Sequence, residues 1–139
     1  MIVLDTNVIS EIFRSAPDPR VVEWLESLTG DVAITTITLA ELLAGVRRLP
    51  HGRRKNDLQA ALGATIEPYK PTRSLLAFDD SAAEQYAEVL FAREQAGLPI
   101  STPDAQIAAI CRVHGATCAT RNEKDFAGTG VRVLNPWTV

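Results

Sequence analysis

Four acidic side chains stand where the predicted strands end or where the following helices begin: Asp5, Glu41, Asp104 and Asp125. Asp5 directly follows residues 2–4, an unbroken apolar run that is typical of a strand buried on both faces of a parallel sheet. The carboxyl ends of parallel strands share one edge of the sheet, and ligands bind outside that edge. We therefore expect the four carboxylates to converge there.

Carboxylates that are brought together in this way repel one another. At about 4 Å and an effective dielectric constant near 20, each pair of unit charges costs about 4 kcal/mol, so such a cluster implies a neutralising cation. The ligands would be oxygen atoms, since the two histidines, His51 and His114, lie elsewhere in the pattern. A site built from oxygen ligands favours Mg²⁺ or Mn²⁺ over zinc.

Each of these acids also has a structural explanation. Asp5 is a preferred N-cap residue for a helix over residues 6–14. Thr38 and Glu41 have the spacing of a capping box. Asp104 stands in the first turn of its helix, where the helix dipole favours a negative charge. At this point both interpretations stay open.

The elements that must position these acids alternate along the chain. Strands are predicted at residues 2–4, 32–35, 75–78, 117–120 and 131–134. The helical stretches between them include 6–14, one from Pro19 to a stop at Gly30, 39–49 and 53–64. The alternation predicts a three-layer α/β/α sandwich with a mainly parallel central sheet.

Two further helices complete the pattern. Ser81 and Glu84 have capping-box spacing ahead of a long helix whose stop signals are Gly97 and Pro99, and its apolar positions are Ala87, Leu90, Phe91 and Ala92. Pro103 suits the first turn of the next helix, which buries Ile107, Ala108, Ile110 and Cys111 and ends at Gly115.

The composition is that of an ordinary globular protein. The 139 residues fit one domain spanning 1–139, with 46% hydrophobic and 22% charged residues. No apolar run approaches the roughly 18 residues of a membrane span, and the first residues lack a basic region, so we expect a cytoplasmic protein. Cys111 and Cys118 lack C-x-x-C spacing and are expected to be buried free thiols.

The net charge of −3 argues against a broad electrostatic attraction to nucleic acid, but positive charge is concentrated in one place. The predicted helical hairpin over residues 39–64 has no acid between 42 and 56 and carries Arg47, Arg48, Arg53, Arg54 and Lys55. Two interpretations remain for this cluster. It is either a solvated face or a surface that contacts RNA phosphates.

Several motifs in order carry a resemblance to a known family. DTN follows the first strand, T-x-A-E lies in residues 38–41, PDAQIAA spans 103–109 and TRNxxDF spans 120–126. This ordered set resembles a PIN domain over the whole chain. The opening DTNVISE and the closing NPW are similar, more narrowly, to the FitB-like branch of VapC-type toxins.

The resemblance implies metal-ligand roles for Asp5, Glu41 and Asp104, with Asp125 preferred to Asn122 as the fourth site residue. It implies that Thr6, Asn7 and Thr120 support the ligands, although simple helix capping would also explain them. The implied activity is that of a Mg²⁺-dependent endoribonuclease, in which a metal-activated water hydrolyses RNA. Glu41 would either hold a second metal or accept the proton of the water.

The implied partners are a cognate antitoxin protein in a type II toxin–antitoxin pair and a second copy of the chain. Three other classes were weighed. A receiver-type signalling domain needs paired acids after the first strand, where this chain has Asp5 and Thr6. A haloacid-type phosphatase needs an acid where Asn7 stands. A non-catalytic binding module with a degenerate site is the remaining alternative.

Overall fold

The computed structural model describes residues 1–71 and 74–139, and within them the strands form a single parallel sheet. Its order is β3-β2-β1-β4-β5, and every neighbouring pair runs parallel. The strands are β1 (Ile2–Leu4), β2 (Val32–Thr35), β3 (Leu75–Leu76), β4 (Thr117–Ala119) and β5 (Val133–Leu134). The predicted parallel sheet is therefore confirmed, with shorter third and fifth strands than expected.

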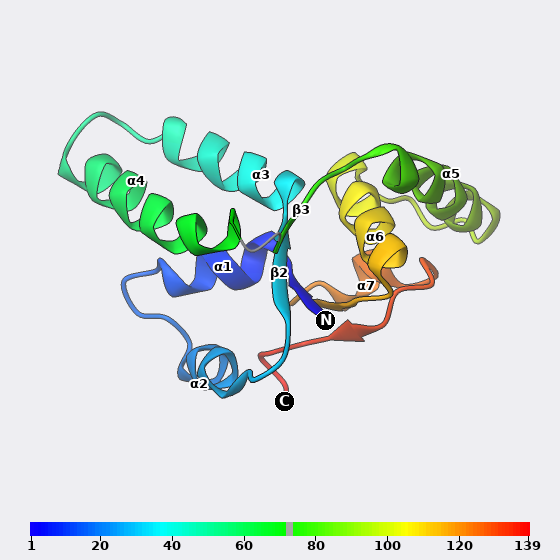
Figure 1. The fold of residues 1–139 in the computed structure, drawn as a ribbon, viewed down its shortest axis with the longest axis horizontal. Helices are drawn as coiled ribbons and strands as arrows, with labels where there is room; N and C mark the ends of the chain where they lie inside the picture. Colours follow the sequence, from blue (N-terminus) through cyan, green and yellow to red (C-terminus); the bar gives the residue numbers. More distant parts are fainter. Residues whose placement is uncertain (72–73) are drawn as a thin grey trace.

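Helices cover both faces of this sheet (Figure 1). One face carries α1 (Thr6–Ile12), α2 (Pro19–Ser27), α3 (Thr36–Arg47) and α4 (Arg53–Ile66), which continues into a 3-10 turn, Glu67–Tyr69. The other face carries α5 (Asp80–Gln95), α6 (Thr102–His114) and the short α7 (Glu123–Phe126). The three-layer α/β/α architecture is as predicted.

Alternation along the strands divides the hydrophobic core into two clusters. Val3 and Ala33 point to the side of α5 to α7, whereas Leu4 and Ile34 point to the side of α1 to α4. Burying each of the larger side chains stabilises the fold by about 1.5–3 kcal/mol. The first cluster also contains Cys111 and Cys118, which are buried free cysteines as predicted.

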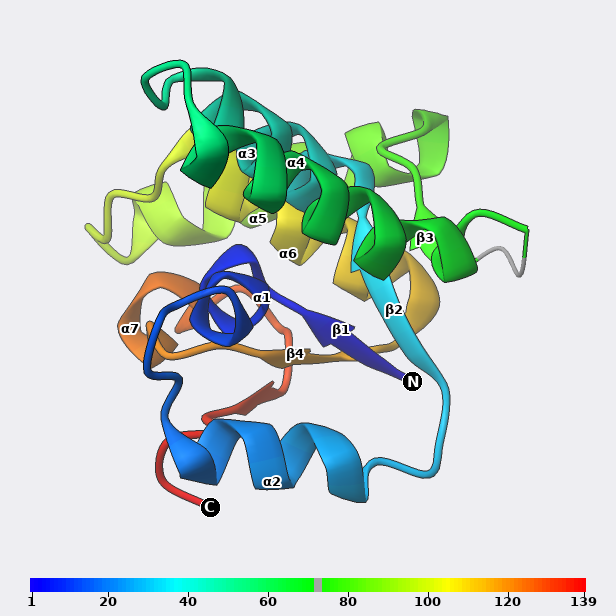
Figure 2. The ribbon, with the colours of Figure 1, turned by 90° about the vertical axis from the view of Figure 1, so that its left-hand side faces the viewer.

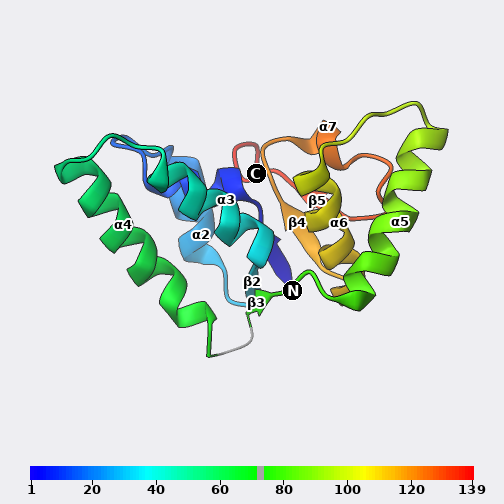
Figure 3. The ribbon, with the colours of Figure 1, turned by 90° about the horizontal axis from the view of Figure 1, so that it is seen from above.

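The views from the side and from above show how the helices frame the carboxyl ends of the strands. Helix α1 lies between α2 and the α3–α4 pair (Figure 2). From above, α3 and α6 lie in the middle, with α4 and α5 on the outer sides (Figure 3). None of the helices in the described part of the chain combines the length and the apolarity that crossing a membrane would require.

The start of α3 corrects one prediction. The helix begins at Thr36, directly after β2, because the Thr35 hydroxyl at the strand end accepts a hydrogen bond from the Thr38 amide at 3.0 Å. Thr35 is therefore the N-cap, and the capping box expected between Thr38 and Glu41 is wrong. Glu41 lies inside the helix, where it has no capping role.

Helix α5 corrects another prediction. Its N-cap is Asp79, which accepts from the Ala82 amide, so the expected capping box of Ser81 with Glu84 is wrong. The helix also turns a different face to the core. Ala87 is exposed and Phe91 is 61% exposed, whereas the helix buries Ala82, Val89 and Arg93. A charged residue thus occupies a core position, which hydrophobic periodicity does not anticipate.

The other helix boundaries follow the sequence signals in most places. Asp18 caps α2 with Pro19 in its first turn, and Gly115, at φ +58°, ends α6 in the left-handed conformation that glycine favours. Helix α2 ends at Ser27, so Gly30 is not its stop signal. The capping interpretation of Asp5 also holds, since its carboxylate accepts from the Thr6 amide at the start of α1.

Candidate active site

A cavity of about 440 Å³ opens at the carboxyl edge of the sheet, where β1 and β4 end and α1, α3 and α6 begin or pass. Three of the four predicted acids, Asp5, Glu41 and Asp104, line this cavity. The rest of its lining consists of Thr6, Asn7, Ser10, Glu11, Arg14, Arg121, Asn122 and Trp137. The predicted convergence of these three carboxyl groups on one edge is therefore observed.

Asp5 is the most enclosed acid of the cavity, with 4% of its surface exposed. Its Oδ1 accepts from the Thr6 amide at 2.8 Å, and its Oδ2 accepts from the Thr120 hydroxyl at 2.8 Å. Burial raises the pKa of Asp5 from 3.8 to about 6, against the lowering effect of these two hydrogen bonds. The negative charges of Asp104 and Glu41 raise this pKa further, so the three groups share one electrostatic environment.

Thr120 and Asn7 hold the Asp5 carboxylate from the β4 side. Leu4 pairs with Ala119 across the sheet, and this register places Thr120 beside Asp5. The Thr120 hydroxyl is fully buried, and it accepts from Asn7 Nδ2 at 3.2 Å while it donates to Asp5. Asn7 Nδ2 also lies 3.3 Å from Asp5 Oδ2. Both polar groups therefore orient the carboxylate.

Thr6 connects Asp5 to Glu41. Its amide donates to Asp5, and its hydroxyl donates to Glu41 Oε1 at 2.7 Å. The same hydroxyl lies 3.1 Å from the Thr38 hydroxyl, which is buried in α3. Glu41 itself is exposed to solvent. One short side chain on α1 thus fixes the position of an acid on α3.

Asp104 stands on the third side of the cavity, in the first turn of α6, and its amide donates to Ser101 Oγ at 3.2 Å. Burial raises the pKa of Asp104, and a hydrogen bond with Ser101 lowers it. The charges of Asp125 and Glu41 raise the pKa, whereas Arg93 lowers it. The negative charges of two other acids, Asp125 and Glu41, therefore act on Asp104.

Asn122 and Asp125 were the two candidates for the fourth position. The structure places Asn122 on the cavity lining, where its backbone N–H donates to Thr120 Oγ1 at 3.1 Å. Asp125 lies in α7 and is half-buried, and it does not line the cavity. Its charge nevertheless acts on Asp104, so Asp125 is adjacent to the cavity.

The side chains of the cavity offer oxygen atoms as ligands for a cation. No three His, Cys, Asp or Glu side chains of residues 1–71 and 74–139 are gathered closely enough to hold a metal ion as they stand. The cavity is nevertheless lined by carboxylate, amide and hydroxyl oxygens, with no His or Cys. Within the same ranges, no Lys or Arg comes within 4.0 Å of the Asp5, Glu41 or Asp104 carboxylates. This donor set fits a small, oxygen-preferring divalent cation that would supply the missing positive charge.

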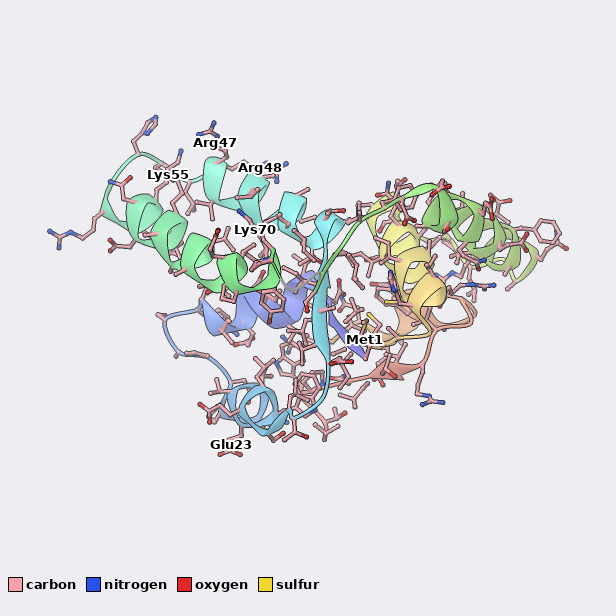
Figure 4. All side chains as sticks on the ribbon, in the orientation of Figure 1. Met1, Glu23, Arg47, Arg48, Lys55 and Lys70 are labelled. Carbon is pink, nitrogen blue, oxygen red and sulfur yellow. The ribbon has the colours of Figure 1, made fainter. Side chains whose placement is uncertain are left out.

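The members of the basic cluster that Figure 4 labels, Arg47, Arg48 and Lys55, lie on the helical hairpin of α3 and α4, and they differ in exposure. Arg47 and Arg48 on α3 and Arg53 and Arg54 on α4 are exposed to solvent. Lys55 differs, because it is 9% exposed and its Nζ donates to the Arg47 carbonyl at 3.0 Å. Lys55 is therefore less available to contact RNA than the four arginines, since its ammonium group joins the two helices.

A second groove, of about 260 Å³, connects this hairpin to the cavity. It is lined by Arg54 and by apolar residues of α3 and α4, and it shares Thr6, Ser10, Arg14 and Glu41 with the cavity. Of the exposed arginines of the cluster, Arg54 therefore lies along a continuous surface that leads to the carboxylates.

Sequence reasoning missed four cavity residues that carry charge or an aromatic ring. Glu11 is buried, and it accepts from Arg14 Nη1 at 3.1 Å and from the Asp18 amide at 3.1 Å. The Arg121 guanidinium lies over the ring of Trp137. Arg121 belongs to the TRN motif and Trp137 to the NPW motif. These motifs supported the family resemblance, but neither residue was assigned a role from the sequence.

Comparison with known proteins gives consistent results. A family model described as the PIN domain matches residues 2–131. The chain is 44% identical to Toxin FitB of Neisseria gonorrhoeae, with 99% of each chain covered. It is 36% identical to VapC ribonuclease Y4jK of Sinorhizobium fredii, covering 99% of this chain and 98% of that protein.

A solved structure of FitAB bound to an IR36 DNA fragment superimposes with a TM-score of 0.93 at 41% identity, covering 100% of this chain and 97% of that chain. The fold, the order of the motifs and these similarities agree over nearly the whole length. The chain belongs to the PIN-domain family, in the group that contains the toxin FitB and VapC ribonucleases.

Proposed function

We propose that this protein is a Mg²⁺- or Mn²⁺-dependent endoribonuclease that acts as the toxin of a type II toxin–antitoxin pair. The observation that carries the proposal is the convergence of Asp5, Glu41 and Asp104 on one cavity at the carboxyl edge of the sheet. The raised pKa values of Asp5 and Asp104 support it, since carboxylates that lack a cationic partner are suited to bind a cation. The similarity to a VapC ribonuclease supports RNA as the substrate.

The roles of the residues follow from their contacts. Asp5, Glu41 and Asp104 would hold the cation, and Asn122 would complete the polar lining. When bound, a divalent cation neutralises charge on the phosphodiester and lowers the pKa of a water molecule. Thr120 and Asn7 keep the Asp5 carboxylate oriented, and Thr6 does the same for Glu41.

Glu41 is also placed to move a proton. It is exposed, and it lies on the cavity with one carboxylate oxygen engaged by the Thr6 hydroxyl. A carboxylate in this position can accept a proton from the attacking water and release it to solvent. No side chain of the protein needs to form a covalent intermediate in this reaction.

The partners are proposed on the same basis. One relative is named Toxin FitB, and one of the solved relatives is FitAB bound to a DNA fragment. We infer that this chain binds a cognate antitoxin and pairs with a second copy of itself. Residues 1–139 would act as one PIN-like domain in this assembly.

The proposal is tested with purified Asp5→Asn and Asp104→Asn proteins, and with Glu23→Gln on the exposed face of α2 as a matched control. Incubated with cellular RNA in Mg²⁺ or Mn²⁺, the wild type and the control should cleave RNA, and EDTA should stop them. Both Asp→Asn variants should lose cleavage while keeping their circular dichroism spectra. Full cleavage by either of these two variants would contradict the mechanism.

A further inference from the structure

The cavity that the three carboxylates line also carries an arginine on an aromatic ring. The Arg121 Cζ atom lies 5.1 Å from the centre of the Trp137 ring, and both residues line the cavity. Trp137 is 5% exposed, so its ring is a buried support and Arg121 covers it. Cation–π contact of this kind holds a guanidinium in a limited range of positions.

The backbone of Arg121 is fixed by the same network that holds Asp5. Its amide donates to Asn7 Oδ1 at 3.3 Å, while Asn7 Nδ2 lies 3.3 Å from the Asp5 carboxylate. On the other side, the Trp137 amide donates to Asn135 Oδ1 at 2.9 Å. The TRN and NPW segments therefore meet here, and together they set the place of one guanidinium relative to the carboxylates.

The two cavity arginines differ in their ion pairs: Arg14 is paired with a carboxylate, and Arg121 forms no ion pair with the described residues. Arg14 contacts both oxygens of the buried Glu11, at 3.1 and 3.2 Å. Arg121 has no carboxylate within 4.0 Å among the described residues. It does help to lower the pKa of Asp18, but Asp18 is already paired with Arg20 at 2.8 Å. Arg121 is thus the cavity arginine whose guanidinium is available to bind an anionic ligand.

We propose that Arg121, held on the Trp137 ring, binds a phosphate of the RNA backbone in the cavity that Asp5, Glu41 and Asp104 also line. This inference rests on the proposed ribonuclease function. An RNA backbone that approaches the three acids is repelled by them, and a preorganised guanidinium in the same cavity offsets that repulsion. The planar fork of arginine matches two phosphate oxygens, which gives position as well as attraction. The NPW segment thereby acquires a role, since its tryptophan supports this arginine.

The inference predicts an effect on binding that is separate from cleavage. Loss of one charge-assisted phosphate contact should weaken RNA affinity about tenfold. It should also reduce the slope of log affinity against log salt concentration by about 0.7, the value for one contact to a single strand. Arg121→Lys should restore the slope, because it keeps the charge, but only part of the affinity, because the fork is lost.

The experiment measures binding of a short, fluorescein-labelled single-stranded RNA of mixed sequence by anisotropy over a series of salt concentrations. All proteins carry Asp5→Asn to prevent cleavage, and they differ by Arg121→Gln, Arg121→Lys or the control Arg132→Gln. Arg132 is an exposed arginine that lines a separate cavity, with Cys111 and Gly115, so its removal makes the same charge change elsewhere. Urea unfolding confirms that each variant is folded.

A second variant tests the supporting ring. Trp137→Phe keeps an aromatic side chain in the core and should reduce affinity less than Arg121→Gln while leaving the salt slope unchanged. If Arg121→Gln binds RNA with the affinity and slope of Arg132→Gln, the inference is overturned, and the proposed function stands as long as the wild type cleaves RNA. If the wild type neither cleaves nor binds RNA, the proposed function itself falls.

Discussion

Replacing Asp5 by Asn should make the protein more stable when no divalent cation is present. The pKa of Asp5 rises from 3.8 to about 6 on folding, chiefly through burial and then through Asp104 and Glu41. At about 1.4 kcal/mol per pKa unit, the ionised carboxylate costs the folded state about 3 kcal/mol at neutral pH. Asparagine removes this cost but keeps only part of the hydrogen bonding to Thr6 and Thr120, so we expect a net gain of about 1–3 kcal/mol.

The sign of the pH dependence follows from the direction of the shift. Because the folded-state pKa of Asp5 lies above the unfolded value of 3.8, its contribution to stability is most favourable below pH 3.8 and is lost as the pH rises through about 6. Asp5→Asn has no such dependence. The advantage of the variant in EDTA should therefore widen by about 2 kcal/mol between about pH 4.5 and about pH 7.5.

The measurement is urea unfolding of both proteins in EDTA across this pH range, repeated in excess Mn²⁺. A cation at about 100 times its Kd should stabilise the wild type by about 2.7 kcal/mol and the variant by much less, since a ligand is missing. Asp18→Asn is the matched control. Arg20 holds the pKa of Asp18 below its usual value, and Asn caps a helix as well as Asp does, so Asp18→Asn should destabilise the protein slightly through the loss of the ion pair with Arg20.

The reasoning is refuted if Asp5→Asn is no more stable than the wild type in EDTA at neutral pH and if the difference between them does not vary with pH. In that case Asp5 would act only as the cap of α1, and burial would carry no electrostatic cost. A wild type whose stability does not respond to Mn²⁺ or Mg²⁺ would separately refute cation binding by the three acids.

Three further outcomes are expected. Asp125→Asn should reduce RNA cleavage less than Asp104→Asn in a side-by-side rate measurement, because Asp125 acts on Asp104 from outside the cavity lining. Arg93→Met should lower the free energy of unfolding in urea by about 1–3 kcal/mol, since it removes the donor from the carbonyls of Leu98, Pro99 and Lys124. In RNA-binding titrations Arg54→Gln should flatten the salt dependence, whereas Lys55→Gln should lower stability and leave the salt slope unchanged, because its Nζ is bonded to a backbone carbonyl.

The positions of the strands and of three acids could be predicted because they depend on local pattern and on one general property of parallel sheets. The apolar run before Asp5 fixes its strand, and the strand end then fixes where the carboxylate emerges. Glu41 and Asp104 follow from the same rule, because each lies on a helix that begins at the same edge. None of these inferences needs knowledge of a distant contact.

The parts that could not be predicted depend on tertiary contacts. Hydrophobic periodicity assigned Phe91 to the core, but the core position of α5 is occupied by Arg93. Arg93 is tolerated there because its guanidinium donates to the carbonyls of Leu98, Pro99, Lys124 and Ala127. These acceptors are backbone atoms up to 34 positions away, and the sequence pattern does not mark them.

The same reasoning explains why the fourth site residue could not be chosen from the sequence. Asn122 and Asp125 are three residues apart around the start of α7, a helix of four residues that periodicity cannot detect. The guanidinium of Arg93 joins the segment just ahead of α6 to α7, because it donates to the carbonyls of Leu98, Pro99 and Lys124. In this arrangement the Asp125 charge raises the pKa of Asp104, and Asn122 lies on the cavity lining. With a neutral side chain on the lining at this position, the cavity keeps three carboxylates that have no Lys or Arg within 4.0 Å among the described residues, because its other acid, Glu11, is paired with Arg14. The repulsion from Asp125 then acts on Asp104 from outside the lining.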